Sequence, residues 1–369
     1  MGFSCGIVGL PNVGKSTLFN CLSSARAESA NYPFCTIEPN VGIVEVPDRR
    51  MQALSDVVHP QQIVPANIRF VDIAGLVRGA SKGEGLGNKF LSHIRDVDAI
   101  CHVVRCFSDE NVTHVDGSVD PVRDVSTIET ELIFADIATV EKRHERALKL
   151  SKGQDPVEKK ALPLTKALLD HLSSGSGNPA RSFVLDDDDD LRRIMRDMHL
   201  LTIKPTLFIA NVEEDGFDPK SNPRLQALLD LAASRGDEVV PICAKIEEEL
   251  TEVEPAERRE LLASYGLDES GLDLVIRAGY RLLGLRTYFT AGEKEVRAWT
   301  IPNGALAPQA AGVIHSDFER GFIKAEVIWW EDFVAGGGES GARAKGKLRL
   351  EGKEYEVRDG DVMHFKFNV

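Results

Sequence analysis

Residues 9–16 read GLPNVGKS, a complete Gly-x4-Gly-Lys-Ser phosphate-binding loop. The loop follows an apolar run at residues 3–8 that has the pattern of a short buried strand, and a helical pattern begins at residue 16. The motif requires this context, because the backbone N–H groups of the loop and of the helix N-terminus then surround phosphates with partial positive charge. The stretch therefore predicts an α/β phosphate-loop (P-loop) fold whose ligand is a nucleoside polyphosphate with Mg2+.

The chemistry of this motif gives roles to individual residues. Lys15 can reach the β and γ phosphates and stabilise phosphoryl charge, which makes it a candidate catalytic residue. The Ser16 hydroxyl can ligate Mg2+. The nucleotide contacts predicted in the loop are Asn12, Val13, Gly14, Lys15, Ser16 and Thr17.

A second carboxylate follows at the end of another strand pattern. Asp72 follows the strand-like residues 68–71, and Gly75 completes an Asp-x-x-Gly motif. We expect Asp72 to support Mg2+ and the Gly75 N–H to contact the γ-phosphate. Thr36 lies in a loop before the strand pattern 41–46, where GTPase-type folds place a threonine that closes on Mg2+. An ordinary loop threonine is the alternative.

Leucine occupies position 76, directly after this motif. Ras-type enzymes have a water-orienting glutamine there. Leucine can neither orient nor polarise water, so hydrolysis requires another group. Five glycines between positions 75 and 87 indicate a segment that can become ordered when a γ-phosphate is bound.

The choice of base depends on the residues that follow the next strand pattern. Guanine-specific switches use Asn-Lys-x-Asp, but this chain has Asn211, Val212 and, at the aspartate position, Glu214. The longer carboxylate disturbs the two-point contact with guanine, whereas Asn211 can still bond to N6 and N7 of adenine. We therefore expect ATP to be preferred over GTP, with lost base selectivity as the alternative. Ala244 and Lys245 are weaker candidates for contact with the base.

Composition limits the class of protein. The chain has 369 residues, enough for two or three domains, and a net charge of −14. This charge argues against binding nucleic acid through a generally basic surface. The sequence has no apolar stretch near the roughly 18 residues that a membrane span requires, and its six cysteines form no CxxC pair. We expect a cytoplasmic protein with no membrane contact.

The middle of the chain changes to helical patterns. Apolar positions at helical spacing occur in three stretches between residues 123 and 202. They predict a helical hairpin inserted into the nucleotide domain, which is either a partner-binding arm or a lobe with purely structural packing. From Arg286 onward the pattern changes to short strands, at residues 297–301, 325–330 and 362–367.

Together these motifs resemble the Obg-like ATPases of the YchF type. The likeness runs along the whole chain, and the glycine-rich segment after Asp72 is far more specific than a phosphate loop alone. The stretches that carry it are GLPNVGKST at 9–17, DIAGLVRGASKGEGLGNKFL at 72–91, NVEE at 211–214, TYFTAG at 287–292, KEVRAWTIP at 294–302 and GDVMHFKFNV at 360–369.

The resemblance implies an architecture of three parts. These are a GTPase-like P-loop NTPase domain at residues 1–283, an α-helical coiled-coil hairpin inserted at 123–202, and a C-terminal β-grasp (TGS) domain at 284–367. It also implies an ATP-hydrolysing relative of the translation GTPases that associates with the ribosome. RNA is a further partner suggested for the TGS domain, because Arg343, Lys345, Lys347 and Arg349 alternate along one basic stretch. A solvated strand face is the alternative.

The resemblance also suggests how water is activated. YchF-like proteins are proposed to use a histidine in a loop after a core strand, and His114 is the matching position. An imidazole that titrates near neutrality can orient or deprotonate water. A solvent-exposed loop histidine is the alternative. Asn12 resembles the asparagine by which some relatives hold K+ against the phosphates.

The function that we expect is therefore slow ATP hydrolysis with Mg2+, coupled to contact with the ribosome. One alternative is a GTPase with relaxed base specificity. Another is a non-catalytic, nucleotide-gated module that binds RNA or the ribosome.

Overall fold

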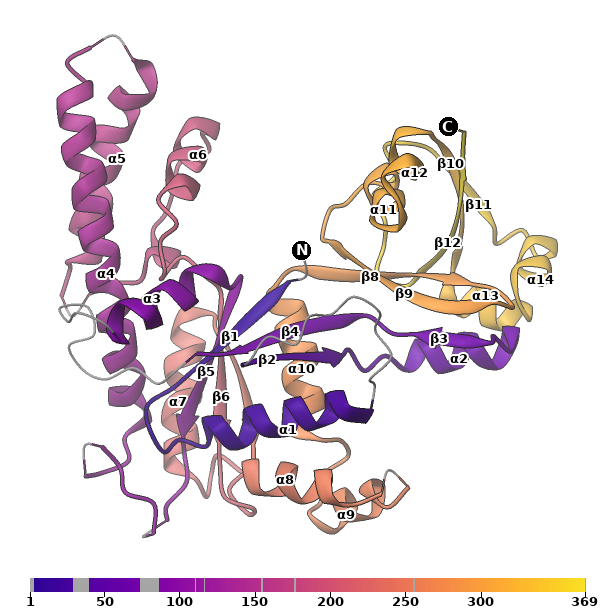
Figure 1. The fold of residues 1–369 in the computed structure, drawn as a ribbon, viewed down its shortest axis with the longest axis horizontal. Helices are drawn as coiled ribbons and strands as arrows, with labels where there is room; N and C mark the ends of the chain where they lie inside the picture. The colour runs from indigo at the N-terminus through magenta and orange to yellow at the C-terminus, as the bar shows by residue number, and fades with distance from the viewer. Residues whose placement is uncertain are drawn as a thin grey trace. The chain divides into compact units, whose positions relative to one another are not determined.

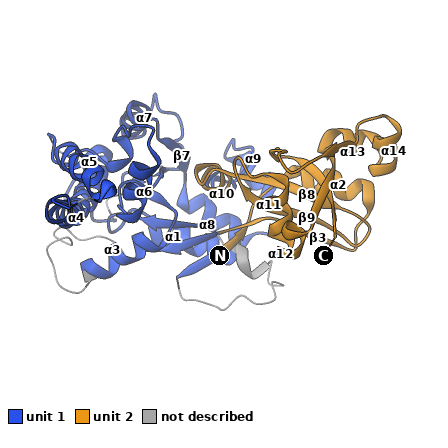
Figure 2. Ribbon diagram, turned by 90° about the horizontal axis from the view of Figure 1, so that it is seen from above, with its two compact units in different colours: residues 1–42, 69–275 blue, residues 43–68, 276–369 orange. Residues whose placement is uncertain are grey.

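A computed structural model describes residues 3–28, 40–73, 86–109, 111–115, 117–153, 155–175, 177–254 and 256–368. The chain divides into two compact units (Figure 2). The first unit comprises residues 1–42 and 69–275, and the second comprises residues 43–68 and 276–369.

A six-stranded sheet in the order β2-β4-β1-β5-β6-β7 positions the phosphate loop (Figure 1). All the pairings from β4 to β7 are parallel. Every residue of β1, β5 and β6 is buried, as expected for central parallel strands that are covered on both faces. The strands are β1 (Ser4–Val8), β2 (Val41–Glu45), β4 (Asn67–Asp72), β5 (Ala99–Arg105), β6 (Thr206–Asn211) and β7 (Glu238–Ile242).

Helices connect these strands, and the parallel order gathers the carboxyl ends of the strands at one edge of the sheet. The phosphate loop leaves the sheet at the end of β1, and α1 begins at Lys15. The connecting helices include α1 (Lys15–Glu28), α3 (Leu86–Asp96) and α7 (Pro223–Arg235). Three further helices follow β7: α8 (Ala244–Glu252), α9 (Arg258–Ser264) and α10 (Gly271–Leu282).

The predicted helices of the insertion are confirmed. They are α4 (Pro121–Leu150), α5 (Pro156–Leu172) and α6 (Asp189–Asp197), with the short η1 (Ala180–Ser182) between α5 and α6. Asp120 and Asp155 cap the N-termini of α4 and α5, each before a proline at the start of the helix. Figure 1 shows α4 and α5 side by side as a hairpin that extends from the sheet. The hairpin and α6 share a core that includes Val140, Leu168 and Ile194.

The second unit is built on a mixed sheet in the order β11-β10-β12-β8-β9-β3. Its strands are β3 (Gln62–Val64), β8 (Leu285–Ala291), β9 (Glu295–Pro302), β10 (Phe322–Trp329), β11 (Arg349–Glu351) and β12 (Asp361–Phe367). The three strands predicted from the C-terminal pattern are confirmed as β9, β10 and β12. Trp330 begins a helix instead of ending a strand.

The sequence pattern did not predict the helices of this unit. They are α2 (Arg49–Val58), α11 (Ala307–Ile314), α12 (Ser316–Arg320), α13 (Trp330–Gly336) and α14 (Glu339–Ala344).

Residues 43–68 belong to the second unit, although they precede most of the first unit in the chain. Strand β3 pairs in parallel with β9, and α2 packs against β8, β9 and α13. Arg50 of α2 forms an ion pair of 2.7 Å with Asp359, and its guanidinium lies 5.0 Å from the centre of the Phe289 ring. The domain boundaries expected from the sequence were 1–283, 123–202 and 284–367. They did not predict that residues 43–68 belong to the second unit.

Among the described helices, none combines the length and the apolar character needed to cross a lipid bilayer.

Candidate nucleotide-binding site

The phosphate loop joins β1 to α1 through a backbone that only certain residues can adopt. Gly14 has a φ of 91°, and a Cβ atom there would lie 2.2 Å from Nδ2 of Asn211. Glycine is therefore required at position 14 both by the backbone angle and by the close approach of a neighbouring side chain. Asn12 also has a positive φ, 62°. The Leu18 N–H donates to the Gly14 carbonyl at 3.0 Å, so the loop leads directly into the helix.

Lys15 and Asp72 form an ion pair at this loop. The pairing of β4 with β1 brings them together, because it places Asp72 beside the strand that leads into the loop. Both side chains are largely shielded, at 11% and 22% exposed. The neighbouring Ser16 is exposed at the start of α1. A carboxylate and a hydroxyl beside an ammonium group suit Mg2+ bound to a phosphate, so these residues fit the predicted ion.

Asn211 has a role that the sequence did not indicate. Its Nδ2 donates to the Val13 carbonyl at 2.9 Å, and its Oδ1 accepts from the Ala244 N–H at 3.0 Å. The side chain is 4% exposed. The amide therefore ties the phosphate loop to the N-terminus of α8. Each of its two polar atoms keeps one further bonding position, so the predicted contact with adenine stays a prediction.

A pocket of about 1050 Å3 opens at the carboxyl ends of β1, β5 and β6. Of the predicted nucleotide contacts, Asn12, Gly14, Thr17, Asn211, Val212 and Glu214 line it, and so do the weaker candidates Ala244 and Lys245. Val13, Lys15 and Ser16 belong to the same loop but not to the lining. The volume is at the upper end of the usual range for small-molecule sites, so the pocket has room for a nucleotide.

Charged side chains meet at the part of this pocket that Glu214 and Lys245 line. Glu214 forms an ion pair with Lys245, and both side chains are well exposed. This contact raises the pKa of Lys245. Glu213 turns the other way, and its carboxylate accepts from the Ser108 N–H. Glu214, which the sequence predicts to lie near the base, therefore has a cationic neighbour on α8.

His114 is buried, at 7% exposed, so the alternative of a solvent-exposed loop histidine is wrong for this conformation. Its Nε2 lies 2.8 Å from Oδ2 of Asp124, whose other oxygen accepts from Arg123. Asn12 of the phosphate loop donates to the Thr113 carbonyl at 3.1 Å. The histidine therefore lies next to a residue that the phosphate loop contacts directly, while a carboxylate holds its ring.

Two predicted site residues, Thr36 and Gly75, lie outside the described residues, as does most of the glycine-rich segment that follows Gly75. Their predicted roles stay predictions.

The sequence reasoning missed several residues that line the pocket. Phe107, Ser108 and Asp109 follow β5, and Tyr265 comes from the end of α9. The first three could have been found, because residues directly after a parallel strand usually face the ligand edge of the sheet. Tyr265 had no comparable signal in the sequence.

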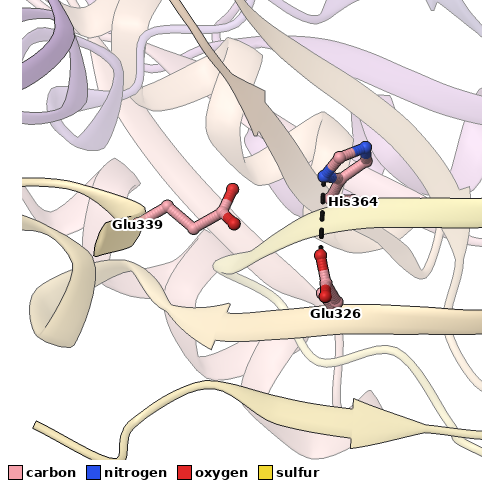
Figure 3. Close-up of side chains that lie close together, drawn as sticks. All are labelled: Glu326, Glu339 and His364. Atoms are coloured by element: carbon pink, nitrogen blue, oxygen red, sulfur yellow. Dashed lines mark ion pairs between the residues drawn. The ribbon is translucent and has the colours of Figure 1, made fainter. Parts of the chain in front are cut away.

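A cluster in the second unit has the composition of a metal site. Glu326, Glu339 and His364 each offer an atom within 4.8 Å of the others (Figure 3). However, Glu326 also pairs with Arg343 and Lys366, both at 3.3 Å, and Arg343 pairs with Glu339 at 2.9 Å. Two side-chain cations already neutralise the two carboxylates, so we interpret the cluster as an ion-pair network.

Residues 4–135 match the family described as 50S ribosome-binding GTPase, and residues 285–368 match the C-terminal family of YchF GTPases, described as of unknown function. The chain is 57% identical to "Ribosome-binding ATPase YchF" of Bacillus subtilis (strain 168) and 54% identical to the protein of the same name from Escherichia coli O157:H7. Both comparisons cover 100% of each chain.

A solved structure titled "Structure of the Schizosaccharomyces pombe YchF GTPase" is also similar. The two sequences are 40% identical, and the structures superpose with a TM-score of 0.88. The match covers 99% of this chain and 98% of the Schizosaccharomyces pombe chain. The matches in sequence, in fold and in both end regions agree. The chain belongs to the YchF family.

Proposed function

We propose that this protein is an Mg2+-dependent ATPase that associates with the ribosome. The observation that carries the proposal is the phosphate loop with Lys15 and Asp72 at its centre, beside a pocket large enough for a nucleotide. The names of the curated relatives support both ATP hydrolysis and ribosome binding.

The proposal gives each residue of the site a role. The N–H groups of the loop and the Lys15 ammonium bind and stabilise the phosphates. Ser16, Thr36 and Asp72 hold Mg2+, which when bound neutralises phosphate charge, and Gly75 contacts the γ-phosphate. Val13, Gly14 and Thr17 complete the phosphate-binding loop, and the proposal gives Asn12 the role of holding K+.

The base end of the pocket favours adenine in this proposal. Asn211, Val212 and Glu214 surround the base, and the carboxylate of Glu214 is shared with Lys245. A carboxylate that is held by a lysine and lengthened by one methylene is poorly placed for the two N–H groups of guanine. Similar proteins are named both as an ATPase and as a GTPase, and the measurement below compares the two nucleotides.

His114 serves as the group that orients water, in place of the glutamine missing at position 76. In the described conformation its ring is buried against Asp124, so this role requires the loop to move. Asn12 connects the two, because it belongs to the phosphate loop and donates to the carbonyl of Thr113, the neighbour of His114.

Ribosome association and a cytoplasmic location complete the proposal. The proposal also includes contact with RNA through the TGS region, residues 284–367. The basic residues that suggested this contact are engaged within the unit: Arg343 with Glu339, Lys347 with Asp332 and Arg349 with Asp361.

Phosphate release from ATP and from GTP, measured with Mg2+ and K+, tests the activity. We expect faster and tighter use of ATP, and a decrease of about 100-fold in kcat for His114→Ala. Asp124→Asn is the matched variant, because it disturbs the packing of the histidine and keeps the imidazole. If His114→Ala lowers only the melting temperature, the histidine is structural. If GTP binds more tightly than ATP, the argument from Glu214 fails.

A further inference from the structure

The tip of the α4–α5 hairpin is basic although the chain as a whole is acidic. Residues 141–166 contain eight Lys or Arg residues and four Asp or Glu residues. The other 343 residues contain 36 Lys or Arg residues and 54 Asp or Glu residues. Positive charge is therefore concentrated at one end of one structural element.

Three of the basic residues lie along one face of α4. Lys142, Arg146 and Lys149 are spaced by four and three residues, which places them in one row on a helix. Val140 and Ala147 point to the opposite side, where both are fully buried against the rest of the hairpin. All three basic side chains are exposed. The row therefore faces away from the core of the arm.

The row continues around the turn of the hairpin. Lys152 lies between the two helices, and Lys159 lies in the first turn of α5. Both are exposed. We call the set Lys142, Arg146, Lys149, Lys152 and Lys159 the basic tip.

Intramolecular contacts do not account for these charges. The other basic residues of the stretch have partners: Arg143 pairs with Glu158 at 2.8 Å, Lys160 with Asp188 at 2.6 Å, and Lys166 with Asp170 at 3.1 Å. Within the described part of the chain, no ion pair involves a member of the basic tip. The acidic neighbours Glu141 and Glu145 lie beside the row on α4, but neither pairs with it.

Unpaired like charges in a row repel one another and contribute nothing to the stability of the arm. An external polyanion removes that repulsion. Lys142 and Lys149 are separated by roughly 10 Å along the helix axis, a length over which a nucleic-acid backbone presents several phosphates. Long side chains without fixed partners suit phosphate contacts that do not depend on sequence.

An acidic protein surface is the competing partner. Leu148 and Leu150 are exposed at 47% and 45% close to the basic tip, and a protein partner could cover them. They lie on opposite flanks of the row and do not form a continuous apolar face, so the charges are the dominant feature. Single exposed apolar side chains are common and need no partner.

We propose that the basic tip binds RNA phosphates and so gives the helical arm a docking function separate from the nucleotide pocket. The inference deepens the proposed function, because it rests on the ribosome being the source of that RNA. The contact is electrostatic, and it therefore depends on salt concentration.

The test uses full-length protein and a fluorescein-labelled RNA hairpin as probe. Binding is measured over a series of salt concentrations for wild type and for the triple variant Lys142→Gln, Arg146→Gln and Lys149→Gln. Losing three phosphate contacts should weaken binding by at least about tenfold at low salt, and should reduce the slope of log K against log salt by about 2 to 3. ATP hydrolysis without RNA should be unchanged, since none of the three residues belongs to the nucleotide site.

The matched control is Lys220→Gln, Lys324→Gln and Lys353→Gln, which removes the same charge from exposed positions elsewhere. It should leave the slope near that of wild type. Equal losses in both variants, or no loss in either, would overturn the proposal. Circular dichroism of both variants excludes unfolding as the cause.

Ribosome sedimentation separates this proposal from the proposed function. If the arm variant loses ribosome binding while its binding of the RNA hairpin is unchanged, the partner is a protein surface and the inference is wrong. If the wild type binds no ribosomes but still binds the hairpin through the basic tip, the proposed function fails and the RNA contact remains.

Discussion

At the scale of single residues, Asn211 connects the phosphate loop to the N-terminus of α8. Asn211→Ala removes its bonds to the Val13 carbonyl and the Ala244 N–H and leaves both groups buried without that partner. Each unsatisfied group costs about 1–3 kcal/mol, so we expect a loss of roughly 3 kcal/mol in stability and weaker binding of nucleotide. Urea denaturation and nucleotide titration measure the two effects. Asn211→Asp is the comparison variant, since it keeps the acceptor and loses the donor. Unchanged stability in Asn211→Ala would contradict this role.

Glu247 makes stability depend on pH. Burial raises the pKa of Glu247 to about 7. Hydrogen bonds from the N–H groups of Gly271 and Leu272 lower this pKa, but the effect of burial is larger. Its Oε2 has no hydrogen-bond partner. Asp273 of α10 also raises this pKa, and Cys21 of α1 is near enough to be affected by the carboxylate. Between about pH 4.5 and 7 the folded chain binds more protons at this site than the unfolded chain, so stability falls as pH rises.

Glu247→Gln should remove this pH dependence, because the amide keeps the acceptor and carries no charge. We expect the variant to exceed wild type by up to about 3 kcal/mol at pH 8, with the difference vanishing near pH 4. Urea denaturation at several pH values measures it, and Glu252→Gln, at an exposed position on the same helix, is the control. If wild type and Glu247→Gln differ in unfolding free energy by the same amount at every pH, the Glu247 carboxylate is not the cause of the pH dependence.

Sequence patterns predicted the residues of the site better than their contacts. Lys15 and Asp72 were predicted separately, and the structure shows that they touch. For Asn211 the motif predicted the position but not the bond to Val13, because a contact between residues this far apart depends on how the strands are ordered. The partner of His114, Asp124, left no pattern, since an acidic residue in the first turn of a helix is common.

At the scale of elements, Asp136 joins the arm to the chain that returns to the sheet. Its carboxylate on α4 accepts from Leu201 N–H at 2.7 Å, Thr202 N–H at 2.8 Å and the Thr202 hydroxyl at 2.6 Å. Asp136→Ala leaves three buried donors without this acceptor, so we expect a loss of about 3 kcal/mol or more. Hydrogen exchange at residues 201 and 202 should become faster. The exposed Asp170→Ala is the control and should cost less than about 0.5 kcal/mol.

Helical sequence patterns predicted the helices correctly where the helices are long and pack against a single apolar core. The helices α4, α5 and α6 showed that pattern because each presents a single buried stripe. The short helices α11 to α14 did not, because five to eight residues contain too few turns to establish a period. Gly337 is the C-cap of α13 and Gly338 precedes α14, so these two glycines separate two short helices.

At the scale of the whole molecule, the second unit is built from two separate segments of the chain. Strand β3 and α2 supply an edge strand and a helix with one buried face, both of which residues 276–369 lack. Leu54 of α2 is fully buried and Met51 nearly so. We therefore expect the fragment 276–369 to unfold without cooperativity, whereas the same fragment fused through a glycine-rich linker to residues 43–68 should unfold cooperatively. Calorimetry of both fragments checks this, and equal cooperativity would show that the early segment is dispensable.

Sequence could not predict this division because the connection is not local. Strand β3 has only three residues, 62–64, which are too few to show an alternation of apolar and polar side chains that would identify its partner strand. It pairs with residues 295–297, more than 200 residues further along the chain. The nucleotide fold, in contrast, was predictable because one loop motif specifies a strand, a turn and a helix together.

The central claim is that the loop at residues 9–16 binds a nucleoside triphosphate through its amides and Lys15. Titration calorimetry with ATP and Mg2+ tests it most directly, on wild type and on Lys15→Ala, with circular dichroism to show that both are folded. We expect saturable binding of one nucleotide per wild-type chain and a loss of at least about tenfold in affinity for Lys15→Ala. Folded wild-type protein that takes up neither ATP nor GTP in the presence of Mg2+ would contradict the claim.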